Sequence, residues 1–204
     1  MENFVVTIAR GYGSGGKTIG KMLAKELGVE YYDQDLIKLA SEESGIHEGL
    51  FGQADEKVKK SFFINKKRYK NGLLSPKSKG FVSDENLFNY QAKVIKELAD
   101  KGNCIIVGRC ADYILKGRKN VVKVFVFADH DACVKNAMET CSITEKEAIR
   151  RIEKIDKERS SYYKYYTGND WDNARNYDVC LDSSDLGFEK CVEIIKGYLK
   201  VKAE

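Results

Sequence analysis

The sequence predicts a single α/β domain built on a parallel sheet of five strands. Five short apolar segments rich in β-branched residues recur along the 204 residues, and polar segments with helical periodicity separate most of them. Strands that alternate with helices form parallel sheets, because each helix returns the chain to the edge where the next strand starts. A chain of this length is sufficient for one sizeable domain with an inserted lobe, and too short for two full domains.

The individual elements follow from apolar runs and helix ends. Residues 4–9 predict the first strand, and residues 17–27 predict a helix that ends before Gly28, a residue type favoured just past helix ends. Residues 29–32 predict the second strand and residues 36–44 the next helix. The remaining strands are expected over residues 104–107, 121–127 and 177–181, and the remaining helices over residues 84–101, 144–166 and 188–201.

About seventy residues separate the second strand from the third, which is far more than a typical connection and requires extra helices. Ser83 is a candidate N-cap for the helix that closes this segment, and Gly102 follows the end of that helix. Residues 57–79 contain nine Lys or Arg residues and neither Asp nor Glu. Two interpretations of this basic stretch stay open: a solvated helix face with a loop, or a lobe that attracts an anionic molecule.

A glycine-rich segment between the first strand and the first helix has the pattern G-x-x-x-x-G-K-[ST]. Its glycines let backbone N–H groups turn toward an anion, and the start of the helix adds free N–H groups and the positive end of its dipole. Lys17 would neutralise phosphate oxygens, and the Thr18 hydroxyl would hold Mg²⁺. A plain strand-to-helix turn would leave these two residues unexplained. We therefore expect the whole loop to bind nucleotide phosphates through Gly11, Tyr12, Gly13, Ser14, Gly15, Gly16, Lys17 and Thr18.

Charged side chains also follow the second and third expected strands. Asp33 and Asp35 come after the second strand, and Arg109 comes after the third. Ligands gather at the carboxyl ends of parallel strands, so these residues are expected at the same edge as the phosphate loop. Asp33 is expected to reach a metal ion through water, whereas Asp35 either caps the next helix or binds substrate. The planar guanidinium of Arg109 would bind the phosphate of an acceptor.

Arg151 and Arg159 lie on the long charged helix expected over residues 144–166. Charges spaced along a helix usually form a solvated face, but phosphoryl transfer places negative charge on the moving group, and a mobile arginine often closes over it. Arg159 is the first candidate for this catalytic role, beside Lys17 and Arg109, and Arg151 is a candidate for substrate binding. The tyrosines of the same segment are expected to pack rather than to stack on a base: Tyr162, Tyr163, Tyr165 and Tyr166.

The composition of the chain gives little support to nucleic-acid binding, membrane binding or a structural zinc site. The formal net charge of +4 is too small to indicate nucleic-acid or membrane binding. Six cysteines form no C-x-x-C pair and only two histidines accompany them, so a structural zinc site has little support and reduced thiols are expected. The chain lacks an apolar run of about 18 residues and the features of a secretory leader. We expect a soluble, cytoplasmic protein whose partners are small-molecule nucleotides.

Five stretches of the chain together resemble the cytidylate-kinase-like family of P-loop nucleoside monophosphate kinases. They are VTIARGYGSGGKTIGKMLAKELG, YYDQDLIKLA, IIVGRCADYIL, DKERSSYYKYYTG and NYDVCLDSSDLG. The resemblance implies a three-layer P-loop NTPase fold over residues 1–204, with residues 46–83 as a basic acceptor-binding insertion and residues 144–170 as a lid. It also implies Mg²⁺-dependent transfer of a phosphoryl group from ATP to a nucleoside monophosphate, with CMP as the first choice.

Two alternatives stay open at this point. Asp33 and Asp35 form a D-x-D pattern after the second strand, and this pattern is similar to shikimate kinases, in which the acceptor is the hydroxyl of a small molecule. Cys110 stands where cytidylate kinases carry an aspartate, and this difference favours a nucleotide-binding regulator without catalysis.

Overall fold

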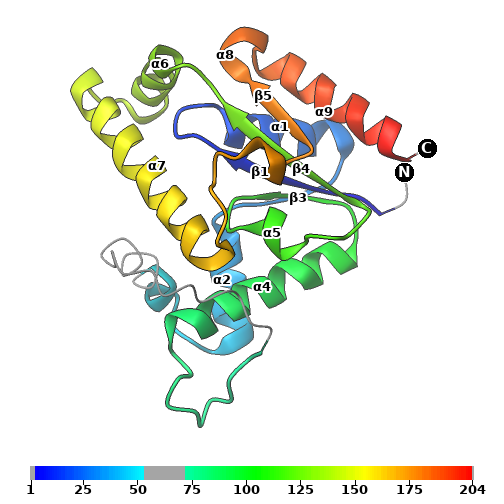
Figure 1. Ribbon diagram of the computed structural model, residues 1–204, viewed down its shortest axis with the longest axis vertical. Coiled ribbons are helices and arrows are strands. Elements are labelled where there is room, and N and C mark those ends of the chain that lie inside the picture. Colours follow the sequence, from blue (N-terminus) through cyan, green and yellow to red (C-terminus); the bar gives the residue numbers. More distant parts are fainter. Residues whose placement is uncertain (1–2, 53–71, 204) are drawn as a thin grey trace.

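The computed structural model describes residues 3–52 and 72–203, and its centre is a sheet of five parallel strands (Figure 1). The strand order is β2-β3-β1-β4-β5, so β1 is the central strand, and the neighbouring strands pair in parallel. The predicted α/β fold with five parallel strands is confirmed. The strands are β1 (Val5–Arg10), β2 (Glu30–Tyr32), β3 (Cys104–Val107), β4 (Val121–Phe127) and β5 (Val179–Asp182).

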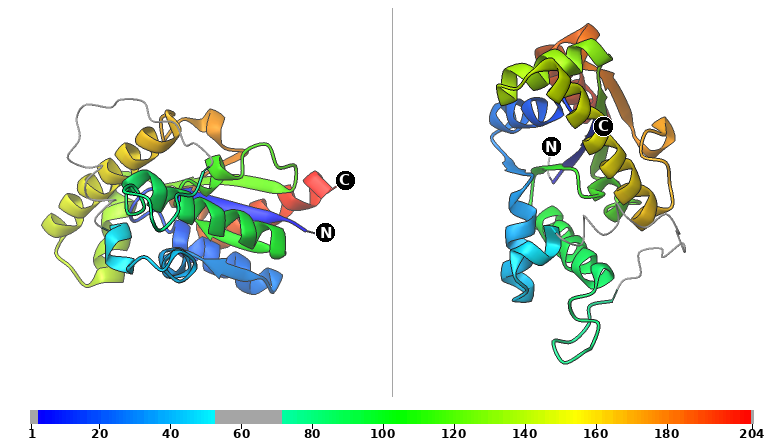
Figure 2. Two further views of the ribbon diagram at one scale, coloured as in Figure 1. Left: turned by 90° about the horizontal axis from the view of Figure 1, so that it is seen from below. Right: turned by 90° about the vertical axis from the view of Figure 1, so that its left-hand side faces the viewer.

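Helices cover both faces of this sheet and make the predicted three layers (Figures 1 and 2). Successive side chains of β1 point to opposite faces. Val6 and Ile8 pack in a core with α1 and α9, whereas Val5 packs in a second core with α4 and α5. The described helices are α1 (Gly16–Leu27), α2 (Asp35–Ser44), α4 (Asp84–Lys101), α5 (Ala111–Ile114), α6 (His130–Cys141), α7 (Glu145–Thr167), α8 (Ser183–Leu186) and α9 (Phe188–Ala203), with a 3-10 helix at Ala174–Asn176.

The C-terminal half of α7 is packed into the core that α2 and α4 share (Figure 2). The ring of Tyr166 stacks on Phe88 of α4, with centroids 4.0 Å apart and planes 6° from parallel. Tyr163 is buried and donates its hydroxyl hydrogen bond to the Asp112 carboxylate at 2.6 Å. The prediction that these tyrosines pack is therefore confirmed for both. Their burial anchors the end of α7.

Several bounds differ from the sequence prediction by one or two residues. Strand β5 starts two residues later than expected, because Tyr177 ends the preceding 3-10 helix and its hydroxyl donates to the carbonyl oxygen of Trp171. Helix α2 begins at Asp35 itself, and its N-cap position is Gln34, so Asp35 is not the cap. Helix α6 was not predicted. The predicted cap at Ser83 is confirmed, since its side chain accepts a hydrogen bond from the amide of Asn86.

The basic stretch at residues 57–79 lies mostly outside the described residues, which resume at residue 72. The six cysteines are free, as expected for reduced thiols. Within residues 3–52 and 72–203, no helix has both the length and the apolar character needed to cross a membrane.

Candidate active site

The phosphate loop connects β1 to α1 in a conformation that requires glycine. Gly13 and Gly15 have φ values of +82° and +75°, in the left-handed region. A Cβ atom on Gly13 would lie 2.3 Å from the carbonyl oxygen of Cys133 on α6, which leaves no space for a side chain. Ser14 connects the loop to β4, because its buried hydroxyl lies 3.0 Å from the Gly11 carbonyl oxygen and 3.1 Å from that of Val126.

The start of α1 provides an anion site of backbone groups. The N-cap residue, Gly15, makes no side-chain cap, and the first turn contains no acidic residue. The first N–H groups of the helix, on Gly16, Lys17 and Thr18, therefore have no helical partner and lie at the positive end of the dipole. The amide of Tyr12 is different, because it donates to Asp156 Oδ1 at 2.8 Å.

Lys17 and Asp33 lie beside this helix end, as the strand-end argument predicted. Lys17 Nζ is 2.7 Å from Asp33 Oδ2, and Arg10 Nη2 is 3.5 Å from Asp33 Oδ1. The Asp33 side chain is 15% exposed, whereas that of Lys17 is 44% exposed. Two cations thus share one carboxylate at the carboxyl edge of the sheet.

A cavity of about 570 Å³ opens over the phosphate loop, and four cationic side chains line it: Arg10, Lys17, Arg109 and Arg159. Asp33 and Glu139 are the acidic lining residues within the described part of the chain. The cavity therefore carries net positive charge, which favours an anionic ligand.

Arg109 reaches the cavity from a strained turn at the end of β3. Arg109 and Cys110 both have φ +55°, a conformation uncommon for residues with a side chain. Arg109 Nη1 lies 3.5 Å from the side-chain oxygen of Gln91 on α4. Backbone strain of this kind clusters at functional sites, and here it belongs to a turn whose arginine lines the cavity.

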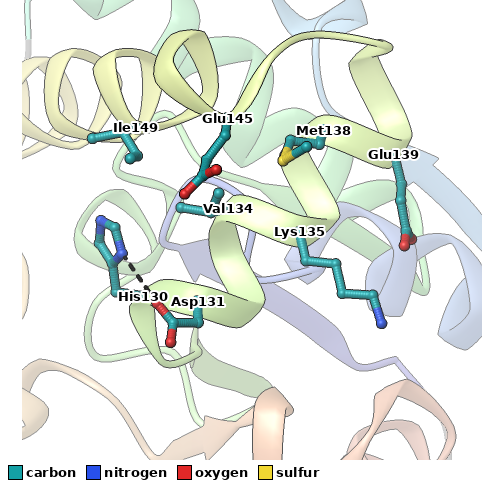
Figure 3. Close-up of a pocket in the computed structure, with 8 residues that line it drawn as sticks. All are labelled: His130, Asp131, Val134, Lys135, Met138, Glu139, Glu145 and Ile149. Carbon is teal, nitrogen blue, oxygen red and sulfur yellow. Dashed lines mark ion pairs between the residues drawn. The ribbon is translucent and has the colours of Figure 1, made fainter.

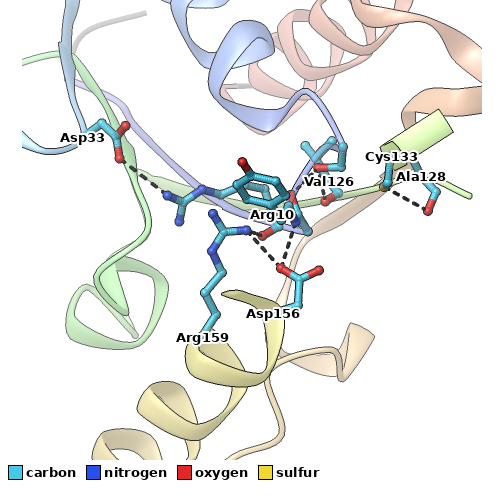
Figure 4. A network of polar contacts seen from close by, with 10 residues as sticks. Arg10, Asp33, Val126, Ala128, Cys133, Asp156 and Arg159 are labelled. Atoms are coloured by element: carbon cyan, nitrogen blue, oxygen red, sulfur yellow. Dashed lines mark hydrogen bonds and ion pairs between the residues drawn. The ribbon is translucent and has the colours of Figure 1, made fainter. Parts of the chain in front are cut away.

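Arg159 binds the backbone of the phosphate-loop region from α7 (Figure 4). Its Nη1 donates to the carbonyl oxygen of Arg10 at 2.9 Å and to Asp156 Oδ1 at 3.1 Å. Its guanidinium carbon also lies 5.8 Å from the ring centroid of Tyr12. Burial lowers the pKa of Arg159 and raises that of Asp156, while each partner's charge opposes the shift of the other. The middle of α7 is thus tied to the phosphate loop.

Two predicted substrate residues lie elsewhere. Asp35 sits in the first turn of α2, and Arg151 pairs with Glu147 one turn away on α7, with 41% of its side chain exposed. Neither is among the residues that line the cavity. Their substrate roles stay predictions.

Three residues of the site were not assigned a role from the sequence. Arg10 ends β1, Asp156 accepts from the loop amide, and Asn136 of α6 donates to the Gly13 carbonyl oxygen at 2.9 Å. The sequence did contain an indication of α6, because Asp is a favoured N-cap residue. Asp129 is the N-cap of this helix and accepts a hydrogen bond from the amide of Ala132 at 2.7 Å. Arg10 could have been found by the argument used for Asp33, since it is a charged residue at the end of an apolar strand.

A second cavity of about 410 Å³ lies between α6 and α7, away from the phosphate loop (Figure 3). None of the site residues predicted from the sequence lines it. Its lining consists of His130, Asp131, Val134, Lys135, Met138, Glu139, Glu145 and Ile149.

Solved structures with the same fold span nearly the whole chain. An uncharacterized protein from Eubacterium ventriosum is 25% identical, with a TM-score of 0.71, and the match covers 97% of this chain and 98% of that one. Shikimate kinase from Bacteroides thetaiotaomicron is 12% identical, with a TM-score of 0.54 and coverage of 97% and 98%. Shikimate kinase from Acinetobacter baumannii, in complex with shikimate, is 14% identical, with a TM-score of 0.50 and coverage of 98% and 95%. These two likenesses establish the fold.

A comparison with curated protein sequences finds no significant match. The sequence profile of the cytidylate kinase-like family matches residues 5–185, which include all the strands, the phosphate loop and α7. Family and fold together support a P-loop kinase. The chain belongs to the cytidylate kinase-like family.

Proposed function

We propose that this protein transfers the γ-phosphoryl group of ATP to a nucleoside monophosphate, with CMP as the first candidate acceptor. The observation that carries the proposal is the convergence of Lys17, Arg109 and Arg159 on one cavity above the phosphate loop. These three side chains come from α1, the end of β3 and α7, which are far apart in sequence. A cavity with several cations suits two phosphorylated molecules better than one.

The residues at the start of α1 fit ATP and Mg²⁺. The positive φ of Gly13 and Gly15 and the uncapped helix end suit the phosphates, with Lys17 beside them. Thr18 and Asp33 would hold Mg²⁺, which commonly keeps several waters and binds through few protein ligands together with phosphate oxygens. The described residues contain no group of three or more His, Cys, Asp or Glu side chains that would suit a metal held by protein alone. When bound, the ion neutralises charge on the phosphate oxygens.

The arginines would stabilise the negative charge that Mg²⁺ and Lys17 do not neutralise. Negative charge spreads over the oxygens of the transferred group, so catalysis consists mainly of positioning and charge compensation. Arg109 would hold the acceptor phosphate, and Arg159 would meet the transferred group from α7. No covalent intermediate on a protein side chain is required.

The lid and the insertion complete the proposal. We assign the lid to residues 144–170, of which α7 forms most, and the acceptor lobe to residues 46–83, of which residues 53–71 lie outside the described part. The end of α7 is anchored through Tyr163 and Tyr166. A lid movement would therefore involve the N-terminal part of α7, which packs on α6.

A coupled assay of ADP release tests this function. The acceptor panel is CMP, UMP, AMP, GMP and shikimate, and shikimate covers the alternative in which a small-molecule hydroxyl is phosphorylated. The Lys17→Ala variant is expected to lose turnover by at least about a hundredfold, because a charge that meets the moving phosphate is removed. Lys25→Ala is the matched control, since Lys25 is an exposed residue of the same helix.

Circular dichroism and thermal unfolding establish that both variants are folded. Nucleoside monophosphate turnover in the wild type, lost in Lys17→Ala and kept in Lys25→Ala, supports the proposal. ATP binding without turnover on any acceptor would support a regulator instead. Normal turnover by Lys17→Ala would contradict the role of the loop.

A further inference from the structure

Arg10 is a buried cation at the centre of the site. It is the last residue of β1 and lines the cavity at the phosphate loop, and Figure 4 shows it between Asp33 and Arg159. Its side chain is only 14% exposed. A buried guanidinium is costly unless nearby groups neutralise its charge and accept its hydrogen bonds.

The described residues do not satisfy this guanidinium. Its ion-pair partner among them is Asp33, at 3.5 Å, and that carboxylate is closer to Lys17 at 2.7 Å. The Nε atom of Arg10 is buried and has no hydrogen-bond partner in the described part of the chain. Burial, together with the charges of the neighbouring Arg159 and Arg109, lowers the pKa of Arg10 to about 10, and the side chain stays charged at neutral pH. The site thus has cationic capacity that Asp33 alone does not balance.

The fold makes space for this side chain at two glycines. A Cβ atom on Gly108 would lie 2.3 Å from Arg10 Nη1, and Gly108 has φ +77°. A Cβ atom on Gly16, the first residue of α1, would lie 2.5 Å from Arg10 Cβ. Both the end of β3 and the start of α1 are therefore shaped around Arg10.

The register of the sheet brings Arg10 beside Arg109. Ile8 of β1 pairs with Val107 of β3, and each arginine comes two residues after its member of this pair. Both arginines therefore follow adjacent parallel strands at the carboxyl edge of the sheet and line the same cavity, and the charge of Arg109 acts on the pKa of Arg10. Two guanidinium groups that line one cavity can together bind a phosphate or a carboxylate.

We propose that Arg10, together with Arg109, binds the anionic group of the acceptor, so that this protein uses an acceptor carrying a phosphate or carboxylate. The inference rests on the proposed phosphoryl transfer and adds a binding residue to it. Two other roles are conceivable for Arg10: it could hold Asp33 in place, or it could bind the nucleotide at the phosphate loop. Only a role in acceptor binding makes the effect of Arg10 depend on the charge of the acceptor.

The test compares charged and neutral ligands on protein saturated with ADP, so that the phosphate loop is already occupied. Calorimetric titrations measure the affinity for CMP against cytidine, and for shikimate against its methyl ester. The wild type is expected to prefer the anion of at least one pair. Arg10→Met is expected to reduce that preference about ten- to a hundredfold, the usual worth of a hydrogen bond to a charged group.

Two further variants separate the loss of charge from damage to the fold. Arg10→Lys keeps the charge without the planar fork and is expected to fall between the wild type and Arg10→Met. Arg118→Met is the matched control, because Arg118 pairs with Asp100 and does not line the cavity. It is expected to leave both the anion preference and ADP binding unchanged, and thermal unfolding verifies that every variant is folded.

The proposal is overturned if the wild type shows no anion preference in either pair, or if Arg10→Met keeps it. It is also overturned if Arg10→Met weakens ADP binding as much as acceptor binding, since Arg10 would then serve the nucleotide. A wild type that binds the anion through Arg10 but releases no ADP with any acceptor would contradict the kinase function while leaving this site intact.

Discussion

The buried carboxyl of Asp112 makes a pH-dependent contribution to stability that can be worked out from the structure. Asp112 lies on α5, is 6% exposed, and accepts the hydroxyl hydrogen bond of Tyr163 from α7. Burial raises its pKa from the ordinary value of 3.8 to about 6, although the hydrogen bond from Tyr163 and the charge of Lys123 act in the opposite direction. We predict that Asp112→Asn removes a pH dependence that the wild type shows.

The sign and size follow from the two pKa values. The pKa in the folded state lies above that of the unfolded chain, so the protonated carboxyl favours the fold. This contribution is fully present below about pH 3.8 and is lost as the pH rises through about 6. A difference of about two pKa units, at about 1.4 kcal/mol per unit, corresponds to about 3 kcal/mol.

Urea unfolding of the wild type and Asp112→Asn, from about pH 4 to about pH 7, measures this difference. The stability of the wild type relative to the variant is expected to fall by about 2 kcal/mol over that range, because at about pH 4 the contribution has not yet reached its full size. Asparagine keeps an oxygen that accepts the Tyr163 hydrogen bond, so the comparison isolates the charge. Asp100→Asn is the control, since Asp100 is an exposed partner of Arg118. A wild-type stability that stays parallel to that of Asp112→Asn would refute the reasoning.

Two further predictions concern the site itself. Gly13→Ala is expected to weaken ADP binding about tenfold or more in calorimetry, because its Cβ meets the Cys133 carbonyl oxygen at 2.3 Å and distorts amides that bind phosphate. Gly28→Ala is the control, because Gly28 shares the left-handed backbone but an added Cβ would meet nothing within 4 Å. It is expected to lower the free energy of unfolding by only about 1 kcal/mol and to leave the affinity for ADP unchanged. Equal ADP affinity in both variants would contradict the steric argument. Arg159→Gln is expected to lower kcat on the order of a thousandfold with a smaller change in the KM for ATP, because under the proposed function its charge would meet the transferred group. A change in KM alone, measured in the coupled assay, would show that Arg159 binds the ground state.

Much of the fold was predictable because local pattern and tertiary packing agree. Strands β3 and β4 have the predicted bounds, since β3 is a continuous apolar run buried on both faces and β4 is apolar except for Lys123. Helix α4 also has its predicted bounds, with Ser83 as its cap. Helix α6 was missed because only Cys133, Val134 and Ala137 of its twelve residues are buried, too few to give a clear period.

The site was predictable where one rule applied, the gathering of ligands at the carboxyl ends of parallel strands. That rule placed Asp33, Asp35 and Arg109 at the edge of the phosphate loop, and Asp33 and Arg109 line the cavity together with Lys17, whereas Asp35 does not. It also applied to Arg10, but a charge that ends an apolar run has a simpler explanation as a solvated strand end. The buried environment of Arg10 depends on Gly108, almost a hundred residues away, and local sequence does not reveal it.

The phosphate loop depends on two helices that do not belong to its motif. Arg159 and Asp156 of α7 and Asn136 of α6 each make a hydrogen bond with the backbone between Arg10 and Gly13. These contacts join residues 123 to 149 positions apart in the chain. Because α6 and α7 also pack on each other through a shared apolar cluster, a displacement of either helix acts on the loop backbone. The backbone geometry of the loop is thus set jointly by its own residues, α6 and α7, and these segments form one structural unit.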